Sequence, residues 1–349
     1  MVLALREKRP DLDIIAVYPW SGPLAADAAR LGVRTRSTRI PWWVTFEHST
    51  AIDRLVRVVT FLPGVVQAVF LQLRLRPTVV ITNTMVIPSH AVAAKLLGIP
   101  HYWMVHEFGR EDHGYKFLFG YRTTLRLIGW LSESVICNSR AVEKALLAAD
   151  PTMKTHVLYP AIVALPRTPA KRHNGELMRV VLVGQFAPSK GQHLAIKAIA
   201  AAREAGVDVQ LTLIGPGDRK PAHELARRVG VQDLVSLHGP TRDVGRYWSA
   251  AHVALMCSDA EAFGLVTVEA MRAGLPVCGT NAGATPEIID PGVNGLLSPA
   301  GDADALAKHL MILESDEDLR QRLGVGAVDT SRRFGQERYG DELAAILRL

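Results

Sequence analysis

Two glutamates in one short stretch, Glu261 and Glu269, have the spacing in this sequence that most suggests chemistry. An apolar run ends at Cys257, a polar loop carries Glu261, and a helical pattern opens at Phe263-Gly264-Leu265 with Glu269 about one turn in. A strand that leads into a helix N-terminus is a ready anion site. Carboxylates repel a phosphate, so they fit there only if they accept hydrogen bonds from a neutral part of the same ligand. The pattern therefore predicts a ligand in which a sugar is joined to a diphosphate.

The two carboxylates have different alternatives. Gly264 lets the backbone approach a ligand, and Glu269 leans back toward the helix start because helical side chains tilt that way. In this interpretation a ribose diol is held there. The helix dipole favours any acid in an early turn, and this accounts for Glu269 but not for Glu261.

Lys190 is a third candidate, in the segment that joins the strand ending at Val183-Gly184 to a helix. Ser189 and Gln192 have capping-box spacing, so a well-made helix start is one interpretation. A cation in the first turn opposes the helix dipole by up to about 1 kcal/mol, and a bound diphosphate would reverse that sign. We therefore expect Lys190 to bind phosphate.

Other polar and glycine positions are less specific. Gly215 and Gly217 end the next strand, where they permit a tight turn and close ligand approach, although a plain surface turn explains them equally. His106 follows an apolar strand, at the end where ligands bind, with Glu107 beside it; from the residues alone an ordinary loop histidine is the preferred interpretation.

We expect no metal site. The spacing of His106 to its neighbouring histidines, His101 and His113, suits no common site. The run Asp302-Ala303-Asp304 resembles a pair that would hold a metal with a diphosphate, but its context is that of a helix N-cap with an acid in the first turn.

The elements that position these residues form two similar halves. In each half, short and nearly continuous apolar runs alternate with helical patterns, which predicts a parallel sheet covered on both faces. The expected fold class is α/β, with two tandem Rossmann-like, doubly wound domains whose ligands lie beyond the carboxyl ends of the strands. The predicted strands are Ile14–Tyr18, Val79–Thr82, His101–Val105, Val135–Cys137, Val157–Tyr159, Val180–Val183, Val209–Ile214, Val235–Leu237, Val253–Cys257 and Pro276–Gly279.

Domain boundaries follow from composition. We expect an N-terminal domain at 1–162, a proline-rich linker at 163–178, a second domain at 179–330, and a C-terminal helical segment at 331–349 with a helical pattern from Phe334 to Leu349. The first domain lacks the apolar strand and Gly-rich turn with which such domains open: Val2 to Leu5 leads into a charged run that is typical of a helix end.

Bulk properties exclude several classes. With 48% hydrophobic and 21% charged residues, the 349-residue chain is typical of a folded globular protein. Its three cysteines have no metal or redox spacing, which suits a reducing cytoplasm. The sequence shows no signal peptide, and no nucleic-acid motif is recognisable, so nucleic acid is not an expected partner.

Charge is divided unevenly between the halves. Residues 1–175 hold 22 Lys and Arg against 12 Asp and Glu, and residues 176–349 hold 18 against 22, so net charges of +10 and −4 give the total of +6. A basic half indicates an anionic membrane or acceptor as partner. Its long helical pattern, residues 49–76, favours a core helix with a solvated basic face; a surface that lies against anionic lipid is the alternative.

These motifs jointly resemble a known family. Glu261 to Gly264, then Glu269 and Gly274 to Val277, resemble the E-x7-E signature of retaining, GT-B-fold glycosyltransferases of family 4. Four further motifs recur in the family's order: Gly184 with Lys190-Gly191, Gly215-Pro216-Gly217, Gly283 with Pro286-Glu287, and Asn294-Gly295.

The resemblance implies roles for single residues. Lys190 would hold the donor diphosphate, Glu261 would bind sugar hydroxyls near the reacting centre, Glu269 would bind ribose, and His106 would be the acceptor-domain histidine near the transferred sugar. The backbone of Phe263, Gly264 and Leu265 would meet sugar and phosphate. The C-terminal helix would cross back to the first domain.

One position departs from the family pattern. Gln185 stands where many members have arginine, which removes one cationic contact to the leaving diphosphate. The remaining donor-binding candidates are Gly184, Gln185, Lys190, Gly215, Gly217, Phe263, Gly264, Leu265 and Glu269, and the catalytic candidates are His106, Glu261 and Lys190.

The resemblance therefore implies a metal-independent hexosyltransferase without a cofactor, which uses a nucleoside diphosphate sugar and a glycan or lipid-linked acceptor in cell envelope polysaccharide synthesis. The expected location is the cytoplasm, peripheral on the inner membrane face. Two alternatives stay open: a non-catalytic or decayed sugar-nucleotide binder, and a nucleotide-sugar 2-epimerase or phosphorylase on the same fold.

Overall fold

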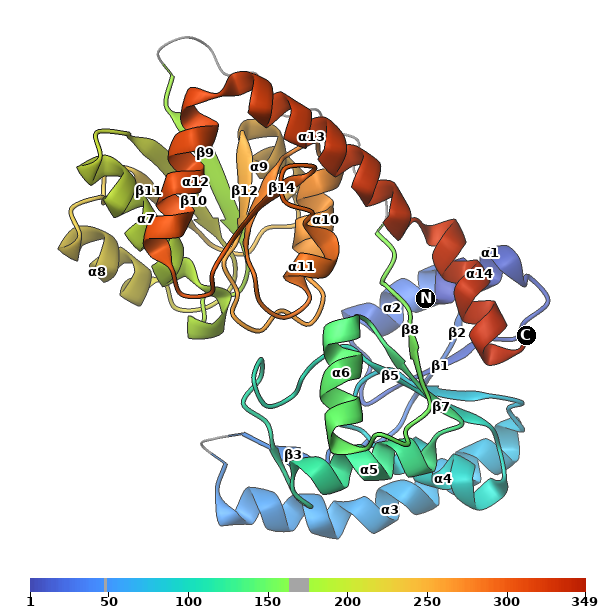
Figure 1. Ribbon diagram of the computed structural model, residues 1–349. Coiled ribbons are helices and arrows are strands. Elements are labelled where there is room, and N and C mark those ends of the chain that lie inside the picture. The colour runs from blue at the N-terminus through green and yellow to red at the C-terminus, as the bar shows by residue number, and fades with distance from the viewer. Residues whose placement is uncertain (47–48, 163–175) are drawn as a thin grey trace. The chain divides into compact units, whose positions relative to one another are not determined.

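The computed structural model describes residues 1–46, 49–162 and 176–349 (Figure 1). These residues divide into two compact units. Unit 1 is Met1–Tyr159 together with Gln336–Leu349, and unit 2 is Pro160–Gly335. Most of the predicted linker, residues 163–178, lies outside the described residues, which resume at Glu176.

Unit 2 is built on one parallel sheet of six described strands in the order β11-β10-β9-β12-β13-β14. Numbered by their order in this unit the strands run 3-2-1-4-5-6, the doubly wound arrangement in which the chain reverses direction across the sheet between strands 1 and 4. The strands are β9 (Met178–Val183), β10 (Val209–Ile214), β11 (Val235–His238), β12 (Val253–Met256), β13 (Val277–Thr280) and β14 (Gly295–Ser298).

Helices cover this sheet, and their apolar sides form a core with it. Strands β12 and β13 are buried along their whole length, as expected for near-continuous apolar runs inside a parallel sheet. The helices of unit 2 are η1 (Pro188–Lys190), α7 (Gln192–Glu204), α8 (Lys220–Arg228), α9 (Gly245–Ala250), α10 (Leu265–Arg272), α11 (Thr285–Ile288), α12 (Ala303–Ser315), α13 (Glu317–Ser331) and η2 (Arg332–Phe334). Asp302 caps α12 with a bond from the backbone N–H of Ala305, as predicted.

Unit 1 has a divided sheet. Four strands pair in parallel in the order β4-β5-β7-β8, and β1 and β2 form a separate parallel pair. Among the described strands, β1 and β4 therefore each have a neighbour on one side only. The strands are β1 (Ile15–Tyr18), β2 (Arg34–Ser37), β3 (Val44–Thr45), β4 (Val80–Thr82), β5 (His101–Val105), β6 (Lys116–Phe117), β7 (Ser134–Cys137) and β8 (Thr155–Val157).

The helices of unit 1 include one at each end of the chain. Helix α14 packs on α1, where the α-carbon of Gly340 lies so close that an added Cβ would be 2.8 Å from the carbonyl oxygen of Ala4. The helices are α1 (Val2–Lys8), α2 (Pro23–Arg30), α3 (Ala51–Leu75), α4 (Ser89–Leu97), α5 (Tyr121–Leu131), α6 (Arg140–Ala149) and α14 (Gln336–Leu347).

The predicted fold class is confirmed: both units are α/β with parallel sheets, and unit 1 begins with the helix α1 in place of a strand. Two expectations are wrong. The last strand of unit 1 is Thr155–Val157, two residues before the predicted position, because Leu158 already leaves the sheet to bond with the carbonyl of Cys137. Helix α3 is not a core helix, since most of its side chains are exposed.

Candidate functional site

In unit 2, Lys190 and Glu261 form an ion pair at the carboxyl ends of β9 and β12. Lys190 Nζ lies 2.8 Å from Glu261 Oε2, and the two side chains are 33% and 14% exposed. Strands β9 and β12 are the neighbours between which the chain order of the sheet reverses. Ligands of doubly wound sheets bind in the crevice at this point, so both charges stand where a ligand of such a fold is held.

The loops after β9 and β10 lie against each other through glycines. Gly184 N donates to the carbonyl oxygen of Ile214, and a Cβ on Gly215 would lie 1.9 Å from the carbonyl oxygen of Gly184. Gly217 adopts φ +113 and pairs with Phe186, whose carbonyl oxygen an added Cβ would approach to 2.8 Å. A side chain is therefore excluded at Gly215 and Gly217, whatever their direct role toward a ligand.

Lys190 is set in place by the residue that follows it. Gly191 adopts φ +69, and a Cβ there would lie 2.0 Å from the carbonyl oxygen of Cys257, at the end of β12. Ser258 Oγ donates to the carbonyl oxygen of Ser189 at 2.9 Å. The turn that carries Lys190 is thus fastened to the loop that carries Glu261.

The capping box expected at this turn is wrong. Ser189 belongs to the short helix η1, and α7 begins at Gln192 after Gly191, with no side-chain cap. Gln192 is buried and its Nε2 donates to the carbonyl oxygen of Gln185 at 2.7 Å. A left-handed glycine that must touch Cys257 ends the first turn before a capping box is able to form. The Gln185 side chain is exposed.

Helix α10 begins beside Glu261. Gly264, its N-cap, adopts φ +92, and an added Cβ would lie 3.1 Å from Thr267 Oγ1 and 3.3 Å from Glu261 Cγ. Phe263 is buried against Phe334 at a ring-centroid distance of 5.4 Å, whereas Leu265 is half exposed. The backbone at Gly264 is therefore the open part of this segment, and Phe263 fixes it from within the unit.

Glu261 is fixed by its own backbone as well. Its carbonyl oxygen accepts from the N–H of Ala284 at 2.8 Å, and a Cβ on Gly283 would lie 2.4 Å from it. The motif around Gly283 therefore supports the Glu261 loop from β13. Asn294, in another predicted motif, donates to the Ile288 carbonyl and accepts from Asp290 N, which is a structural role.

Glu269 is half-buried one turn into α10. Burial raises the pKa of its carboxyl group above the ordinary value. Among the described residues it has no hydrogen-bond or ion-pair partner. A carboxylate with free acceptor oxygens at the first turn of a helix suits a ligand that donates from hydroxyls.

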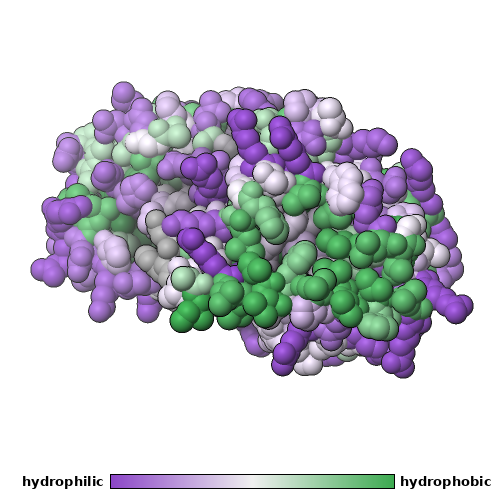
Figure 2. All heavy atoms as spheres, turned by 90° about the horizontal axis from the view of Figure 1, so that it is seen from below, coloured by the Kyte–Doolittle hydropathy of each residue, from purple (hydrophilic) through white to green (hydrophobic). Residues whose placement is uncertain are grey.

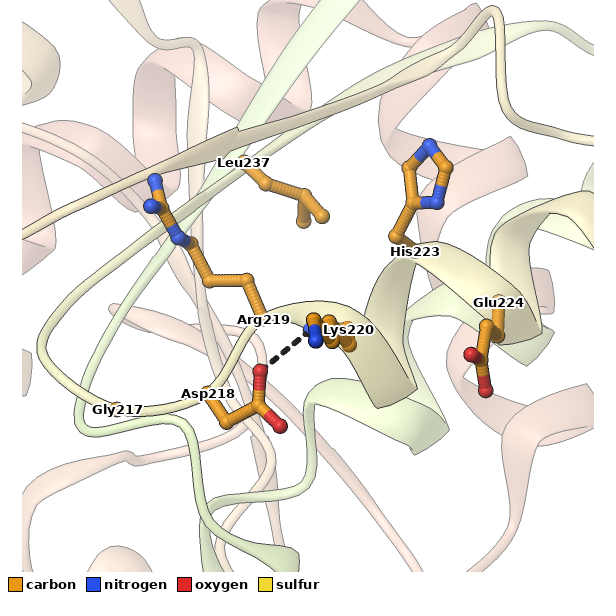
Figure 3. A pocket seen from close by; sticks show the side chains of 7 residues that line it. All are labelled: Gly217, Asp218, Arg219, Lys220, His223, Glu224 and Leu237. Carbon is orange, nitrogen blue, oxygen red and sulfur yellow. Dashed lines mark hydrogen bonds between the residues drawn. The ribbon is translucent and has the colours of Figure 1, made fainter.

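An open pocket of about 480 Å³ adjoins the glycine turn after β10. Figure 3 shows Lys220, His223 and Glu224 on α8 and Leu237 on β11, with Gly217 at the rim. Asp218 Oδ1 accepts from the backbone N–H of Lys220 at 3.0 Å. The sequence analysis did not single out Lys220 or His223, because nothing in their spacing distinguishes them from the polar side of a helix.

In unit 1, His106 follows β5 and is half-buried. Its Nε2 lies 2.7 Å from Asn83 Oδ1, which follows β4. With the amide in this orientation the proton is on Nε2 and Nδ1 is free to accept. Burial lowers the pKa of His106 below its ordinary value, with Glu107 opposing and the charged N-terminus of the chain adding to the decrease. The imidazole is therefore neutral at pH 7.

Glu107 holds the loop around His106 together. It is buried, and its carboxylate accepts from Thr84 Oγ1 at 2.6 Å, Met85 N at 2.9 Å and His106 N at 3.0 Å. Asn138, after β7, donates to the His106 carbonyl oxygen at 3.0 Å. Sequence reasoning missed Asn83 and Asn138; both directly follow predicted strands, which is the signal that was available.

These residues divide between the two units. Lys190, Glu261, Glu269 and the glycine turns share one sheet edge in unit 2, and His106 with Asn83 and Glu107 occupies the corresponding edge in unit 1. The edge in unit 2 combines a cation, hydroxyl-accepting carboxylates and the N-terminus of a helix, and so has groups for both parts of a ligand that joins a phosphate to a polyol.

Residues 168–328, nearly all of unit 2, match the family model described as Glycosyl transferases group 1. This unit belongs to that family. Among curated proteins the chain is 32% identical over 181 residues to the D-inositol 3-phosphate glycosyltransferase of Kribbella flavida, a match that covers 48% of this chain and 43% of that protein. It is 31% identical over 159 residues to the phosphatidyl-myo-inositol mannosyltransferase of Mycobacterium leprae, which covers 44% and 42%. Each match spans less than half of the relative's length.

Solved structures share the fold over the whole chain. Anabaena HepE in complex with UDP-glucose has a TM-score of 0.76 at 20% identity, covering 99% of this chain and 94% of that one. A glycosyltransferase from Rickettsia africae has a TM-score of 0.76 at 15% identity, covering 99% and 92%. The group 1 chain thus has the GT-B fold, which confirms the predicted family and architecture.

Proposed function

We propose that this chain is a retaining glycosyltransferase that moves a hexose from a nucleoside diphosphate sugar to a hydroxyl of a glycan or lipid-linked acceptor. The observation that carries the proposal is the pairing of Lys190 with Glu261 at the switch point of a group 1 unit, 2.8 Å apart and accessible to a ligand. HepE, which has the same fold, is known in complex with UDP-glucose.

Binding of the donor would replace the ion pair by contacts with the ligand. Lys190 would turn to the diphosphate, where the backbone N–H groups at the start of α10 also point, and Glu261 would accept hydrogen bonds from sugar hydroxyls. Glu269 would accept from the ribose. These preorganised donors stabilise the departing diphosphate electrostatically, so the proposal requires no metal ion.

In the transfer step the bond between the anomeric carbon and the diphosphate oxygen breaks. The acceptor oxygen forms its bond to the same carbon on the same face, and its proton passes to the departing phosphate oxygen. His106, neutral and oriented by Asn83, would bind the transferred sugar from unit 1.

The first test is a donor panel. Thermal unfolding with UDP-, GDP- and ADP-sugars finds the donor, because a ligand that binds only the folded state raises its stability. Turnover is then measured with an acceptor mixture and with donor alone. Epimerised or phosphorolysed donor without acceptor would favour the alternative chemistry on the same fold.

The second test uses single substitutions. Lys190→Ala and Glu261→Ala are each expected to reduce kcat/KM about 100-fold or more, in the range measured for loss of one charge-stabilising donor. Lys197→Ala, at an exposed lysine of α7, is the matched control and should turn over like the wild type. If the Lys190 and Glu261 variants keep wild-type turnover, the proposed site is wrong. Donor binding without any turnover would favour a non-catalytic binder.

A further inference from the structure

Helix α3 of unit 1 presents apolar side chains on the face that it turns away from the protein. Its buried residues, Gly64, Val65, Ala68 and Gln72, repeat every three to four positions and form one narrow stripe. Gln72 Nε2 donates to the carbonyl oxygen of His90 on the neighbouring helix α4 at 2.9 Å. The rest of the helix carries nine exposed large apolar side chains between Ile52 and Leu73.

These side chains belong to a wider apolar face. Leu62 and Phe70 on α3 are each 68% exposed, and Leu96 on α4 and Trp130 on α5 are exposed to 68% and 62%. Figure 2 shows hydrophobic residues as a continuous green area on the side seen from below, the side on which α3 lies in Figure 1. Contiguous apolar areas of this kind are rare on soluble proteins and mark an interaction surface.

Basic residues frame this face. Arg54 and Arg57 stand near the first turns of α3, Arg74 and Arg76 at its last turn and C-cap. Helix α5 adds Arg122 and Arg126, four and eight residues before Trp130 on the same stripe. The one acidic residue on helices α3, α4 and α5 is Asp53, whose carboxylate is engaged by Thr50 in a capping box.

Aromatic rings accompany the cations at the edges. The Arg57 guanidinium lies 5.6 Å from the ring centroid of Trp42, and Lys95 Nζ lies 5.1 Å from that of Trp130. Tryptophan is enriched where an apolar phase meets water, and long basic side chains place their charge at the same level.

We propose that this lipid-docking face, formed by the exposed sides of α3, α4 and α5, binds an anionic bilayer surface. Helix α3 lies in the membrane plane with Leu62 and Phe70 among the acyl chains, and the arginines at its ends contact lipid phosphates. The inference goes beyond the proposed transferase activity and does not depend on it.

Two other partners fit the observations less well. Helix α3 is long and apolar enough to cross a bilayer by length and composition, but crossing would expose the Gln72 amide and its stripe to lipid and separate it from His90. A second copy would pair the same face with itself about a two-fold axis. Both ends of α3 are basic, so either direction of pairing brings arginine against arginine.

The test is co-sedimentation of the full chain with vesicles of phosphatidylcholine alone or mixed with phosphatidylglycerol. We expect binding to the anionic vesicles that weakens with salt as screening shortens. Leu62→Glu with Phe70→Glu should reduce partitioning about tenfold or more, since two large side chains leave the apolar phase. Leu24→Glu with Val325→Glu, equally exposed and away from this face, is the matched control and should bind as the wild type.

A second measurement covers the case in which the charged variant folds poorly. All three native cysteines are buried, so a bimane label on Phe70→Cys reports from that position. We expect a blue shift with anionic vesicles and quenching by nitroxide-labelled acyl chains, and neither for a label on Val325→Cys. An unshifted label at position 70 overturns the proposal. So does a wild-type dimer that Leu62→Glu with Phe70→Glu converts to a monomer without any vesicle binding.

Discussion

The Lys190–Glu261 pair joins two residues that are 71 positions apart and have opposite preferences in a ligand. In the structure each neutralises the other, so neither is left as a lone charge at the sheet edge. A ligand that carries both an anion and hydroxyls satisfies the two at once, whereas phosphate alone would leave Glu261 against an anion. Selectivity for a sugar diphosphate over free phosphate is therefore a property of this pair.

Gly264 gives a residue-scale prediction with an internal control. Gly264→Ala places a Cβ in a left-handed backbone (φ +92) and 3.3 Å from Glu261 Cγ; Gly206→Ala has the same strain (φ +82) with nothing within 4 Å. Both variants should lose about 1 to 2 kcal/mol of unfolding free energy, measured by urea titration. Only Gly264→Ala should also lose donor affinity, by calorimetry, because only there is a neighbouring site residue displaced. Equal affinity losses would contradict this role of Gly264.

The same residues show what a sequence is able to predict about a site. Gly184, Lys190, Gly264 and Glu261 were found because each follows an apolar run, and strand ends meet at one edge of a parallel sheet. The ion pair itself and the Asn83 contact to His106 depend on side-chain directions between segments far apart in the chain, for which one sequence has no signal.

At the scale of elements, α3 depends on its first-turn cap more than other helices do. Residues 51–60 are exposed on nearly every side, so packing contributes little to these turns. Thr50 Oγ1 accepts from Asp53 N at 3.2 Å and Asp53 Oδ2 accepts from Thr50 N at 2.7 Å. The bond from the Thr50 backbone, followed by that from its hydroxyl, lowers the pKa of Asp53. The cap therefore persists above the ordinary Asp pKa and is lost as the pH falls through the lowered one.

Thr50→Ala is expected to fray the start of α3 without unfolding unit 1. Loss of an N-cap costs about 0.5 to 2 kcal/mol, and here that cost falls on turns with few other contacts. Hydrogen exchange should quicken at residues 51–60 and stay unchanged at 64–75, where Val65 and Ala68 are buried. Thr60→Ala, which removes only a bond to the Val56 carbonyl, is the control. Uniform exchange along the helix in Thr50→Ala would contradict this account.

Element prediction succeeded for apolar strands and failed for polar ones. Strands β5 and β10 have the predicted ends because His101–Val105 and Val209–Ile214 are apolar runs with clear boundaries. Strand β2 has the sequence Arg-Thr-Arg-Ser and was missed, since it lies at an edge and buries little. For α3 the composition is the same whether protein or lipid covers it, so only the structure separates the two cases.

At the scale of the whole molecule, a buried histidine ties stability to pH. His101 is buried in unit 1, where its Nε2 lies 2.8 Å from Thr82 Oγ1. Burial lowers its pKa to about 3, against about 6.5 in the unfolded chain. Above the unfolded value neither state is protonated and His101 adds no pH dependence. Below it only the unfolded chain takes up the proton, so stability falls by about 1.4 kcal/mol per pH unit.

This predicts a steeper acid loss in the wild type than in His101→Gln. Urea midpoints of unit 1, followed by amide exchange or by tryptophan fluorescence, should be compared at pH 7.5 and pH 5. The wild type should lose about 2 kcal/mol more than His101→Gln over this interval. His193→Gln, at an exposed histidine of α7, should lose as much as the wild type. Parallel losses in wild type and His101→Gln would assign the acid sensitivity to other groups.

The divided sheet of unit 1 has a consequence for handling the protein at high concentration. Strand β1 is wholly apolar, half exposed, and hydrogen-bonded to another described strand only through β2. Its other side offers unpaired amides beside Ile15 and Val17 without the charges that Arg34 and Arg36 supply on β2. Open edges of this kind nucleate intermolecular strand pairing and fibril growth, against which charged gatekeeper residues protect. Slow aggregation of this chain should therefore start from β1, and it should show the spacing of stacked strands rather than an amorphous precipitate.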